Sequence, residues 1–495
     1  MAPSLEQARS DVQSAFEAVR HWVDIDEPRA LFETEQETWT RLLALGRALM
    51  ALFLLRQASR PRAAEYTRDG LRFVVMPKAR TSEVGTRFGK VAFTRPVGRL
   101  NGQRRGACDL PVDRELGLCG GFSLGVVLGL SRLCTQMAFA AARETFAQAY
   151  EWMPSPRAVL RMVDAVGEKA RAFLEGVAAP VDDGEVLVVQ VDGRGAPMIN
   201  DTEYRRRRQP HRSDRLALDR HARRQRRRAW PKKKRRAKGD KSKNAKLAVV
   251  GVLYTLRRTA QGMEGPICKR VYGTFESHEA LFIWLRREAD KRGYGRKETI
   301  FLADGCEHIW RLQLKYFPQA EACIDWYHVV EKVWLAGECL HREGSSELRD
   351  WVAKQTARLR RDSAHLVLHE LRTELAAIPR TGPGSKGKRK RLRLVIRYFE
   401  SHLPRMNYGS LRRRDLDIGT GAAEGAVRNL IAVRLDGPGM RWGRLRAEHV
   451  LHLRCILVNG LWDQFVAHLA AAGDLTLAAQ PQLARPHNAK ARAAA

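Results

Sequence analysis

The pattern of apolar and polar positions changes its period along the chain. From Leu5 to about Gln57, apolar residues recur at helical spacing and predict two or three helices. Short β-like runs between Leu71 and Phe93 then predict a small β element. The most apolar window, Leu42–Leu55, has 14 residues and contains Arg47. It is too short and too interrupted to span a bilayer, so it predicts a buried helix.

A second helical region follows the β element. Phe139–Trp152 has the pattern of a helix that stops at Pro154, and Ser155 with Pro156 begins another. Two helices joined by a tight turn fit a helix-turn-helix. They fit an ordinary helical hairpin equally well, because a single sequence carries no signature of a recognition helix.

Strands dominate the pattern from Glu185 onward. The apolar run Val186–Val191 and two later β-like runs predict a three-strand meander. Helices and strands then alternate, with predicted bounds Ser277–Arg292, Thr299–Ala303, Glu307–Tyr316, Ala322–Ile324 and a helix opening at Asp325. The order β-β-β-α-β-α-β-α is that of a ribonuclease-H-like α/β domain.

The remaining pattern is mostly helical. A charged helical stretch from about Leu335 to Pro404 is broken by Gly382–Gly387 and predicts an α-helical insertion. A last helix is predicted from about Leu445 to Leu469. The predicted division is a helical region 1–60, a small β element and linker 61–120, a helical segment 121–180, the first part of the core 185–334 with a basic insertion 205–246, the helical insertion 335–410, the last part of the core 411–470 and a disordered tail 471–495.

Charge changes this picture. The chain has 88 Lys and Arg against 55 Asp and Glu, a formal net charge of +33, which indicates a polyanionic partner. The segment Arg205–Lys246 alone holds 21 Lys or Arg against three Asp. This segment has too few apolar residues to form a core, so its composition predicts an arm that binds nucleic acid. The expected DNA contacts within it are Arg205, Arg206, Arg207, Arg208, Lys232, Lys233, Lys234, Arg235 and Arg236. A solvated linker without selectivity, or an RNA-binding tract, is the alternative.

The cysteines give no disulfide pattern. All eight are scattered, without a C-x-x-C pair, which suits a reducing cytoplasm. The first thirty residues carry charges throughout, unlike a signal peptide. The sequence therefore predicts a cytoplasmic protein with no membrane partner.

Three acidic residues stand at ends or edges of separate elements. Asp192 follows the strand Val186–Val191, and Asp304 follows Thr299–Ala303. Either Asp-Gly pair alone is more typical of an ordinary turn. Glu424 lies at the edge of an apolar helical stripe, where its partner is either Arg428 one turn on or a metal ion. Mg²⁺ prefers such oxygen ligands, and two ions about 4 Å apart serve phosphodiester chemistry.

The motifs around these acids carry a resemblance. V-D-G at Val191–Gly193 and L-A-D-G at Leu302–Gly305 precede I-D-W-Y-H-V-V-E-K at Ile324–Lys332. G-x-x-E-G-x-x-R-N-L at Gly421–Leu430 and R-L-D-G-P-G-M-R-W at Arg434–Trp442 follow. In order and content, from roughly Asp109 to His468, the chain resembles the DDE transposases of bacterial insertion sequences, closest to the ISKra-type families and more distantly the Mutator-like ones.

The resemblance implies specific roles. Asp192, Asp304 and Glu424 are the expected catalytic residues and ligands of two Mg²⁺ ions, with Mn²⁺ as a substitute. Asp325, Tyr327 and His328 are candidates of second rank, for which a strand end and helix cap beside the site is the favoured alternative. Contacts to phosphate or to a splayed base are expected from Arg428, Arg434, Arg441 and Trp442, although Trp442 also fits a core position.

The resemblance also implies partners and an activity. The expected partner is double-stranded DNA, both the terminal inverted repeats of a transposon and the target, bound by a homodimer or a larger assembly of a bacterial, nucleoid-associated protein. The expected reaction is strand cleavage followed by strand transfer. A domesticated nuclease of the same fold remains an alternative, as does a non-catalytic DNA-binding protein. Three uncompensated carboxylates disfavour the latter, since they add nothing to phosphate binding.

The basic segment gives a first prediction. Replacing Arg205–Lys246 with an uncharged Gly/Ser linker of equal length should flatten the salt dependence of DNA binding by several units, since each neutralised phosphate contributes about −0.9 to the slope of log K against log[salt]. Fluorescence anisotropy with duplex DNA at a series of salt concentrations measures this slope. An unchanged slope would show that the segment does not supply the affinity.

Overall fold

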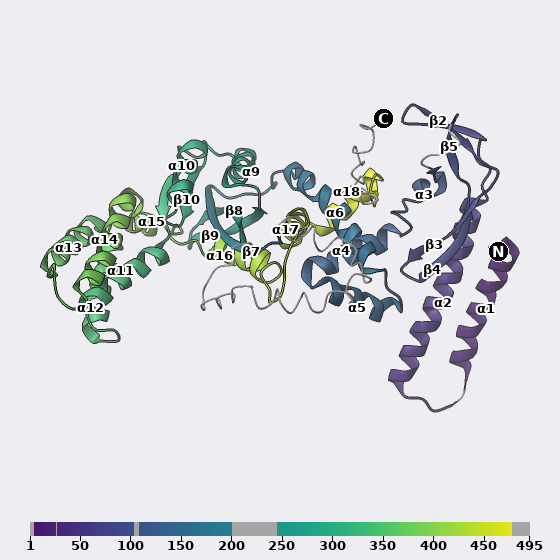
Figure 1. Cartoon of the computed structure of the whole chain (residues 1–495), viewed down its shortest axis with the longest axis horizontal. Helices are drawn as coiled ribbons and strands as arrows, with labels where there is room; N and C mark the ends of the chain where they lie inside the picture. Colours follow the sequence, from purple (N-terminus) through teal and green to yellow (C-terminus); the bar gives the residue numbers. More distant parts are fainter. Residues whose placement is uncertain (1–3, 26, 103–107, 200–244, 478–495) are drawn as a thin grey trace, which may run out of the picture. The chain divides into compact units, whose positions relative to one another are not determined.

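The computed structural model describes residues 4–25, 27–102, 108–199 and 245–477 (Figure 1). The chain is of mixed α/β type with a helical N-terminal region. It divides into two compact units, one of Met1–Phe173 with Gly460–Ala495 and the other of Leu174–Asn459. The candidate carboxylates all belong to the second unit.

The first unit begins with two long helices, α1 (Leu5–Asp24) and α2 (Leu31–Ala58), as the sequence predicts. Ser4 caps α1 by accepting a hydrogen bond from the backbone N–H of Gln7. Short strands follow: β1 (Glu65–Arg68), β2 (Leu71–Val75), β3 (Arg80–Thr86), β4 (Gly89–Arg95), β5 (Gly98–Leu100) and β6 (Cys108–Asp109). β3 and β4 form a hairpin, and its Val84, Val91 and Phe93 share a core with Leu54 and Leu55 of α2.

The prediction that Leu42–Leu55 is a buried helix is only half right. Leu43, Leu54 and Leu55 are buried, but Leu42 and Phe53 keep 44% and 45% of their surface exposed. α1 and the β3–β4 hairpin pack on α2 without covering these two side chains fully. By length and composition alone α2 could cross a membrane, as core helices of soluble proteins also could.

The rest of the first unit is helical. Its elements are α3 (Pro111–Glu115), α4 (Leu124–Gln136), α5 (Phe139–Tyr150), α6 (Pro156–Gly176) and α18 (Trp462–Ala472). The single helix predicted from Leu445 to Leu469 is wrong. α17 (Arg444–Val458) ends before Gly460, whose φ of +69° is left-handed and stops the helix, and α18 begins at Trp462.

A five-stranded mixed sheet is the centre of the second unit. Its strands are β7 (Val186–Pro197), β8 (Ala245–Thr259), β9 (Gly262–Thr274), β10 (Glu298–Ala303) and β11 (Glu321–Ile324), in the order β11-β10-β7-β8-β9. β7, β8 and β9 pair antiparallel, which confirms the predicted meander. β10 and β11 run parallel to β7. Val186–Val191 is buried throughout, as expected of a strand covered on both faces.

Helices cover both faces of this sheet. Gly251 of β8 lies against Leu285 of α9 (His278–Lys291), whereas Gly273 of β9 lies against Leu451 of α17. Gly273 pairs with Val250, the neighbour of Gly251 in β8, and successive residues of a strand face opposite sides. α9 and α17 therefore pack on opposite faces. α10 (Glu307–Tyr316) packs beside α9, and α16 (Gly421–Val427) lies on β7 and β8.

The helical insertion forms where the sequence predicts it. α11 (Trp326–Leu340) leads from the sheet into α12 (Ser346–Leu359), α13 (Ala364–Ala377) and α14 (Ser385–His402), which pack on one another and on α11 (Figure 1). A short 3-10 turn, η2 (Leu403–Arg405), and α15 (Tyr408–Arg413) lead back to α16, which continues into a π-helical turn, η3 (Arg428–Ala432).

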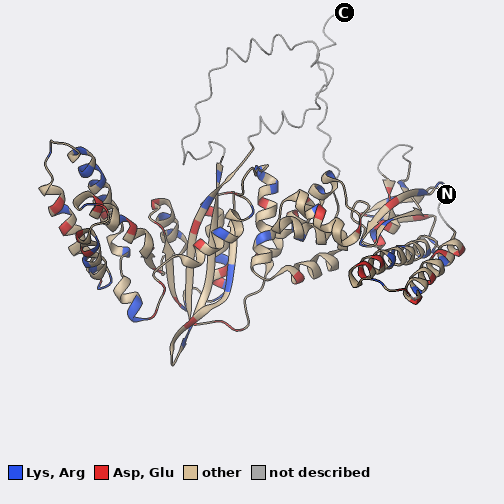
Figure 2. Ribbon diagram, turned by 90° about the horizontal axis from the view of Figure 1, so that it is seen from below, with Lys and Arg blue, Asp and Glu red and all other residues tan. Residues whose placement is uncertain are grey.

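Charged residues are mixed over both units. Figure 2 shows Lys and Arg interspersed with Asp and Glu over the described helices and strands. Of the basic segment Arg205–Lys246, only the last two residues belong to a described element, the start of β8. The nine DNA contacts predicted there lie outside the described residues.

A buried ion pair lies where β8 and β9 contact the end of α9. The Arg292 guanidinium, fully buried, donates to both oxygens of Asp183 and to the carbonyl of Cys268. Burial raises the pKa of Asp183, but hydrogen bonds from Arg292 and Thr255 outweigh it and bring the value to about 2. This depressed pKa stabilises the fold above the unfolded value of about 3.9, and the contribution is lost as pH falls through about 2.

The Arg292–Asp183 pair yields a stability prediction. Arg292→Met should lower the free energy of unfolding by about 3 kcal/mol, because it removes the buried guanidinium that pairs with Asp183, leaving that carboxylate only Thr255 and Lys297, and takes the donor from several carbonyls. Urea unfolding followed by circular dichroism measures the loss. Arg257→Met is the matched control, since its partner Asp182 is exposed and such pairs contribute about 0–1 kcal/mol. Equal effects of the two substitutions would contradict the role of burial.

Candidate active site

Asp192 and Asp304 lie on neighbouring strands of the sheet. β10 ends just before Asp304, but β7 continues past Asp192 to Pro197, so the predicted strand end at Val191 is wrong. Val191 of β7 pairs with Ala303 of the parallel β10, so the two aspartates occupy matching positions on neighbouring strands. Each is half-buried and accepts one backbone hydrogen bond, Asp192 from Gly193 at 2.6 Å and Asp304 from Cys306 at 2.9 Å. In the described part of the chain, the second oxygen of each carboxylate has no hydrogen-bond partner and is available to a ligand.

Gln190 holds the helix that carries Glu424. This buried amide, two residues before Asp192 on β7, accepts a hydrogen bond from the backbone N–H of Ala423 at 3.0 Å. Its amide nitrogen donates to the carbonyl of Gly419 at 3.2 Å and to the hydroxyl of Tyr254. Gln190 thus fixes the first turn of α16 to the strand that carries Asp192. Sequence reasoning missed it, although it is the polar residue within the apolar run Val186–Val191.

Asp325 fastens the same turn from the other side. It is fully buried, and its Oδ1 accepts from the backbone N–H and the hydroxyl of Thr420, at 2.7 and 3.0 Å. Its Oδ2 accepts from the backbone N–H of His328 at 2.9 Å, which caps α11, and lies 2.7 Å from His328 Nδ1. The favoured alternative of a helix cap beside the site therefore describes Asp325 well.

His328 is oriented by this aspartate. An ionised carboxylate only accepts hydrogen bonds, so Nδ1 of His328 donates and Nε2 remains for another partner. The hydrogen bond that His328 donates to Asp325 outweighs burial and raises the pKa of His328, and the charge of Asp304 raises it further. Burial raises the pKa of Asp325, but its bonds to His328 and Thr420 bring it below the ordinary value.

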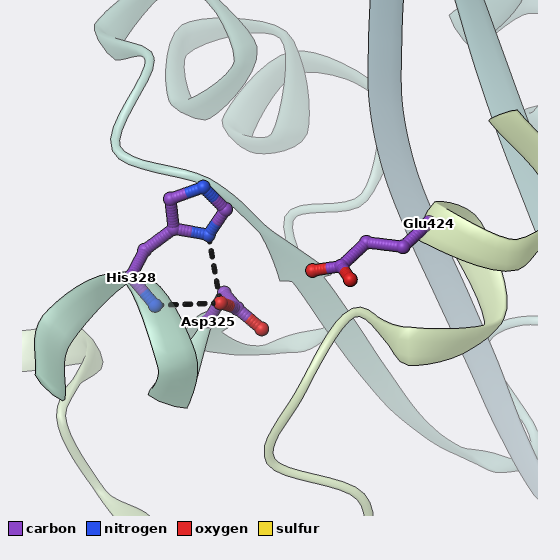
Figure 3. A group of neighbouring side chains, drawn as sticks. All are labelled: Asp325, His328 and Glu424. Carbon is purple, nitrogen blue, oxygen red and sulfur yellow. Dashed lines mark hydrogen bonds and ion pairs between the residues drawn. The ribbon is translucent and has the colours of Figure 1, made fainter. Parts of the chain in front are cut away.

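Glu424 joins the group from α16. Figure 3 shows its carboxylate reaching toward Asp325 and His328, and ligand atoms of the three residues lie within 4.8 Å of one another, an arrangement that could hold a metal ion. Glu424 is exposed, with Thr420 Oγ1 at 3.5 Å. It forms no ion pair with Arg428 in the described structure. Of the two partners considered from the sequence, Arg428 or a metal ion, the arginine is therefore not used.

The carboxylates act on one another. Burial raises the pKa of Asp192, and the negative charges of Asp304 and Glu424 raise it further, while His328 lowers it. Among the described residues, no Lys or Arg forms an ion pair with Asp192, Asp304 or Glu424. An uncompensated cluster of this kind fits a divalent cation, because carboxylate oxygens are its preferred ligands and neutralise its charge. Asp192, Asp304 and Glu424 have free oxygens for it, whereas those of Asp325 are already engaged.

The other expected site residues divide into two groups. Arg428 and Arg441 are exposed, and Tyr327, at 66% exposure, packs on Gly419. Arg434 and Trp442 are buried, with the guanidinium 4.7 Å from the centre of the Trp442 ring. The indole N–H of Trp442 donates to the carbonyl of Leu435, and its backbone pairs beside β7. In this conformation Arg434 and Trp442 belong to the core; their contact with DNA stays a prediction.

Comparisons with known proteins add little. No family model and no curated protein matches this chain. Among solved structures, the Drosophila P element transposase strand transfer complex aligns over 75% of this chain and 82% of that chain, at 11% identity and a TM-score of 0.24. A likeness this weak establishes neither a common fold nor a common activity.

The Asp325–His328 pair gives a pH prediction. Asp325→Asn should lower the pKa of His328, because the asparagine NH₂ donates to Nδ1 and favours the neutral ring. Chemical-shift titration of ¹³C-labelled histidine measures it. The raised pKa stabilises the native protein fully below about 6.5, and this contribution is lost as pH rises through the folded value.

The same titration has a matched control. Glu331→Gln removes a more exposed carboxylate that also raises the pKa of His328, but only by charge at a distance, so a smaller shift is expected. Shifts of equal size in both variants would mean that the hydrogen bond of Asp325 does not orient His328.

Proposed function

We propose that this chain is a DDE transposase, a metal-dependent enzyme that cuts DNA at transposon ends and joins the ends to target DNA. The observation that carries the proposal is the uncompensated cluster of Asp192, Asp304 and Glu424. These carboxylates come from a strand, the end of a neighbouring strand and a separate helix, and no described cation offsets them. Such a cluster costs stability through mutual repulsion, and a protein that only binds phosphate gains nothing from it.

The topology of the second unit supports the proposal. In chain order its strands are three antiparallel and two parallel, and the first strand lies at the centre of the sheet. This is the order expected of a ribonuclease-H-like domain. The helical insertion between α11 and α16 falls between the second and third acidic residues, as the resemblance to the insertion-sequence transposases implies.

Asp192, Asp304 and Glu424 would hold the divalent cations, two Mg²⁺ in the proposed enzyme. Bound there, such ions would activate the attacking oxygen and stabilise the leaving oxygen of a phosphodiester. The chain's own residues supply position. Gln190 and Asp325 fix the turn that carries Glu424, and His328 presents Nε2 beside the acidic cluster, where a protonated ring can donate to a phosphate oxygen.

The net charge supports DNA as the partner. The charge of +33 attracts a polyanion, and the exposed Arg428 and Arg441 flank the segment between η3 and α17 close to the cluster in sequence. Binding to inverted repeats and target DNA, assembly of a homodimer or larger complex, and a bacterial cytoplasmic location are part of the same proposal.

Substitution of the three acids tests the proposal. Asp192→Ala, Asp304→Ala and Glu424→Ala should each reduce Mg²⁺-dependent cleavage by about 100-fold or more, while DNA affinity stays the same or rises, because these groups serve the transition state and repel phosphate. The assay uses a plasmid that carries the DNA flanking the coding sequence, with gel analysis of nicked and joined products.

Asp350→Asn is the control, since it removes an exposed acid on α12 and should leave cleavage unchanged. A variant of the three that cleaves normally would lose its assignment. Cleavage without joined products would instead favour a nuclease of the same fold.

A further inference from the structure

A cavity opens next to Asp304 within the second unit. It has a volume of about 470 Å³, within the range of roughly 300–1,000 Å³ typical of ligand sites, and lies between α10 and α14. Gly305, the residue after Asp304, forms part of its wall. A Cβ at Gly305 would lie 2.4 Å from the ring of Tyr398, so only glycine lets α14 approach the end of β10 this closely.

Two hydrogen-bond donors in the cavity wall have no acceptor. The hydroxyl of Tyr398 and the indole N–H of Trp310 are buried without a partner in the described structure, and Trp310 is 2% exposed. Burial raises the pKa of Tyr398, and so does the charge of Asp304, which keeps the hydroxyl protonated. Buried donors left unpaired destabilise the fold, and a ligand with acceptor atoms removes that cost.

Three arginines surround the same cavity. Arg311 and Arg397 are exposed, and Arg405 stacks on Trp310 with its guanidinium 4.7 Å from the ring centre. No ion pair joins any of them to a carboxylate in the part of the chain that the structure describes. The lining also includes the exposed carboxylate of Glu307, which repels phosphate but accepts hydrogen bonds from exocyclic amino groups.

We propose that this cavity binds one unstacked nucleobase of an unpaired DNA nucleotide beside the cleaved bond, with the flanking phosphates on Arg311 and Arg397. Every base has a flat face that stacks on an aromatic ring or a guanidinium, and its edge carries acceptors for buried donors. Enzymes that need a base out of the helix hold it in a pocket of this composition. The assignment rests on the proposed function, which brings DNA to Asp304.

Photocrosslinking tests the proposal directly. The probe is a DNA duplex with a short single-stranded overhang that carries one 5-iododeoxyuridine, bound to the full chain in Ca²⁺. Irradiation should link the modified base to Tyr398, Trp310 or His402, identified by mass spectrometry of the digested complex. Crosslinks found only on other elements would overturn the assignment.

Affinity measurements give a second test. Arg397→Gln and Tyr398→Leu should weaken binding of the overhang duplex about tenfold, with little change for a blunt duplex, since one stacked base contributes about 1–3 kcal/mol. Tyr398→Phe keeps the ring but removes the hydroxyl donor, so it should lose less affinity than Tyr398→Leu. Arg349→Gln, an exposed arginine on α12 outside the cavity, should affect both duplexes alike.

The outcomes separate this proposal from the proposed function. Equal weakening of overhang and blunt duplexes by Arg397→Gln would show general phosphate attraction rather than a base pocket, whatever the cleavage assay gives. Crosslinks in the cavity together with absence of Mg²⁺-dependent cleavage would leave the pocket assigned and refute the transposase activity.

Discussion

Repulsion between like charges is the constraint on which the second unit depends. The negative charges of Asp304 and Glu424 help to raise the pKa of Asp192, and the described chain offers no Lys or Arg in an ion pair with any of the three. The fold must therefore hold them together with contacts that carry no compensating charge. It does so through hydrogen bonds between backbone and buried polar side chains, which resist separation of the elements without removing the negative potential that a cation requires.

Gln190 and Asp325 are the residues that provide these bonds. One reaches the start of α16 from the centre of the sheet and the other from the end of β11, so the turn before Glu424 is fastened on two sides. His328 extends the same network toward the cluster. The acids themselves make few bonds, and the rigidity of the site resides in neighbours that are already satisfied by hydrogen bonds.

Much of the second unit can be predicted from the sequence because its signals are local. Apolar runs followed by Asp-Gly mark β7 and β10, and parallel pairing of these strands brings Asp192 next to Asp304. The bond from Gln190 to Ala423 joins residues far apart in sequence, and no local pattern encodes it. The same limit applies to Arg434 and Trp442, since a motif does not tell whether an arginine stacked on a tryptophan faces the solvent or the core. Gly460 ends a helix whose apolar spacing continues unbroken, so periodicity alone overruns it.

Each of the two long insertions of the second unit starts and finishes at residues that are hydrogen-bonded to one another. β7 and β8 pair as far as Pro197 and Ala245, and the helical insertion starts and finishes where Trp326 donates its backbone N–H to Ile418 and Asp325 binds Thr420. Since the entropy of closing a loop grows only slowly with its length, each insertion can lengthen, shorten or change composition at small cost to the sheet. The hydrogen bonds that join the ends of each insertion thus let the acidic residues keep their positions whatever the length of either insertion.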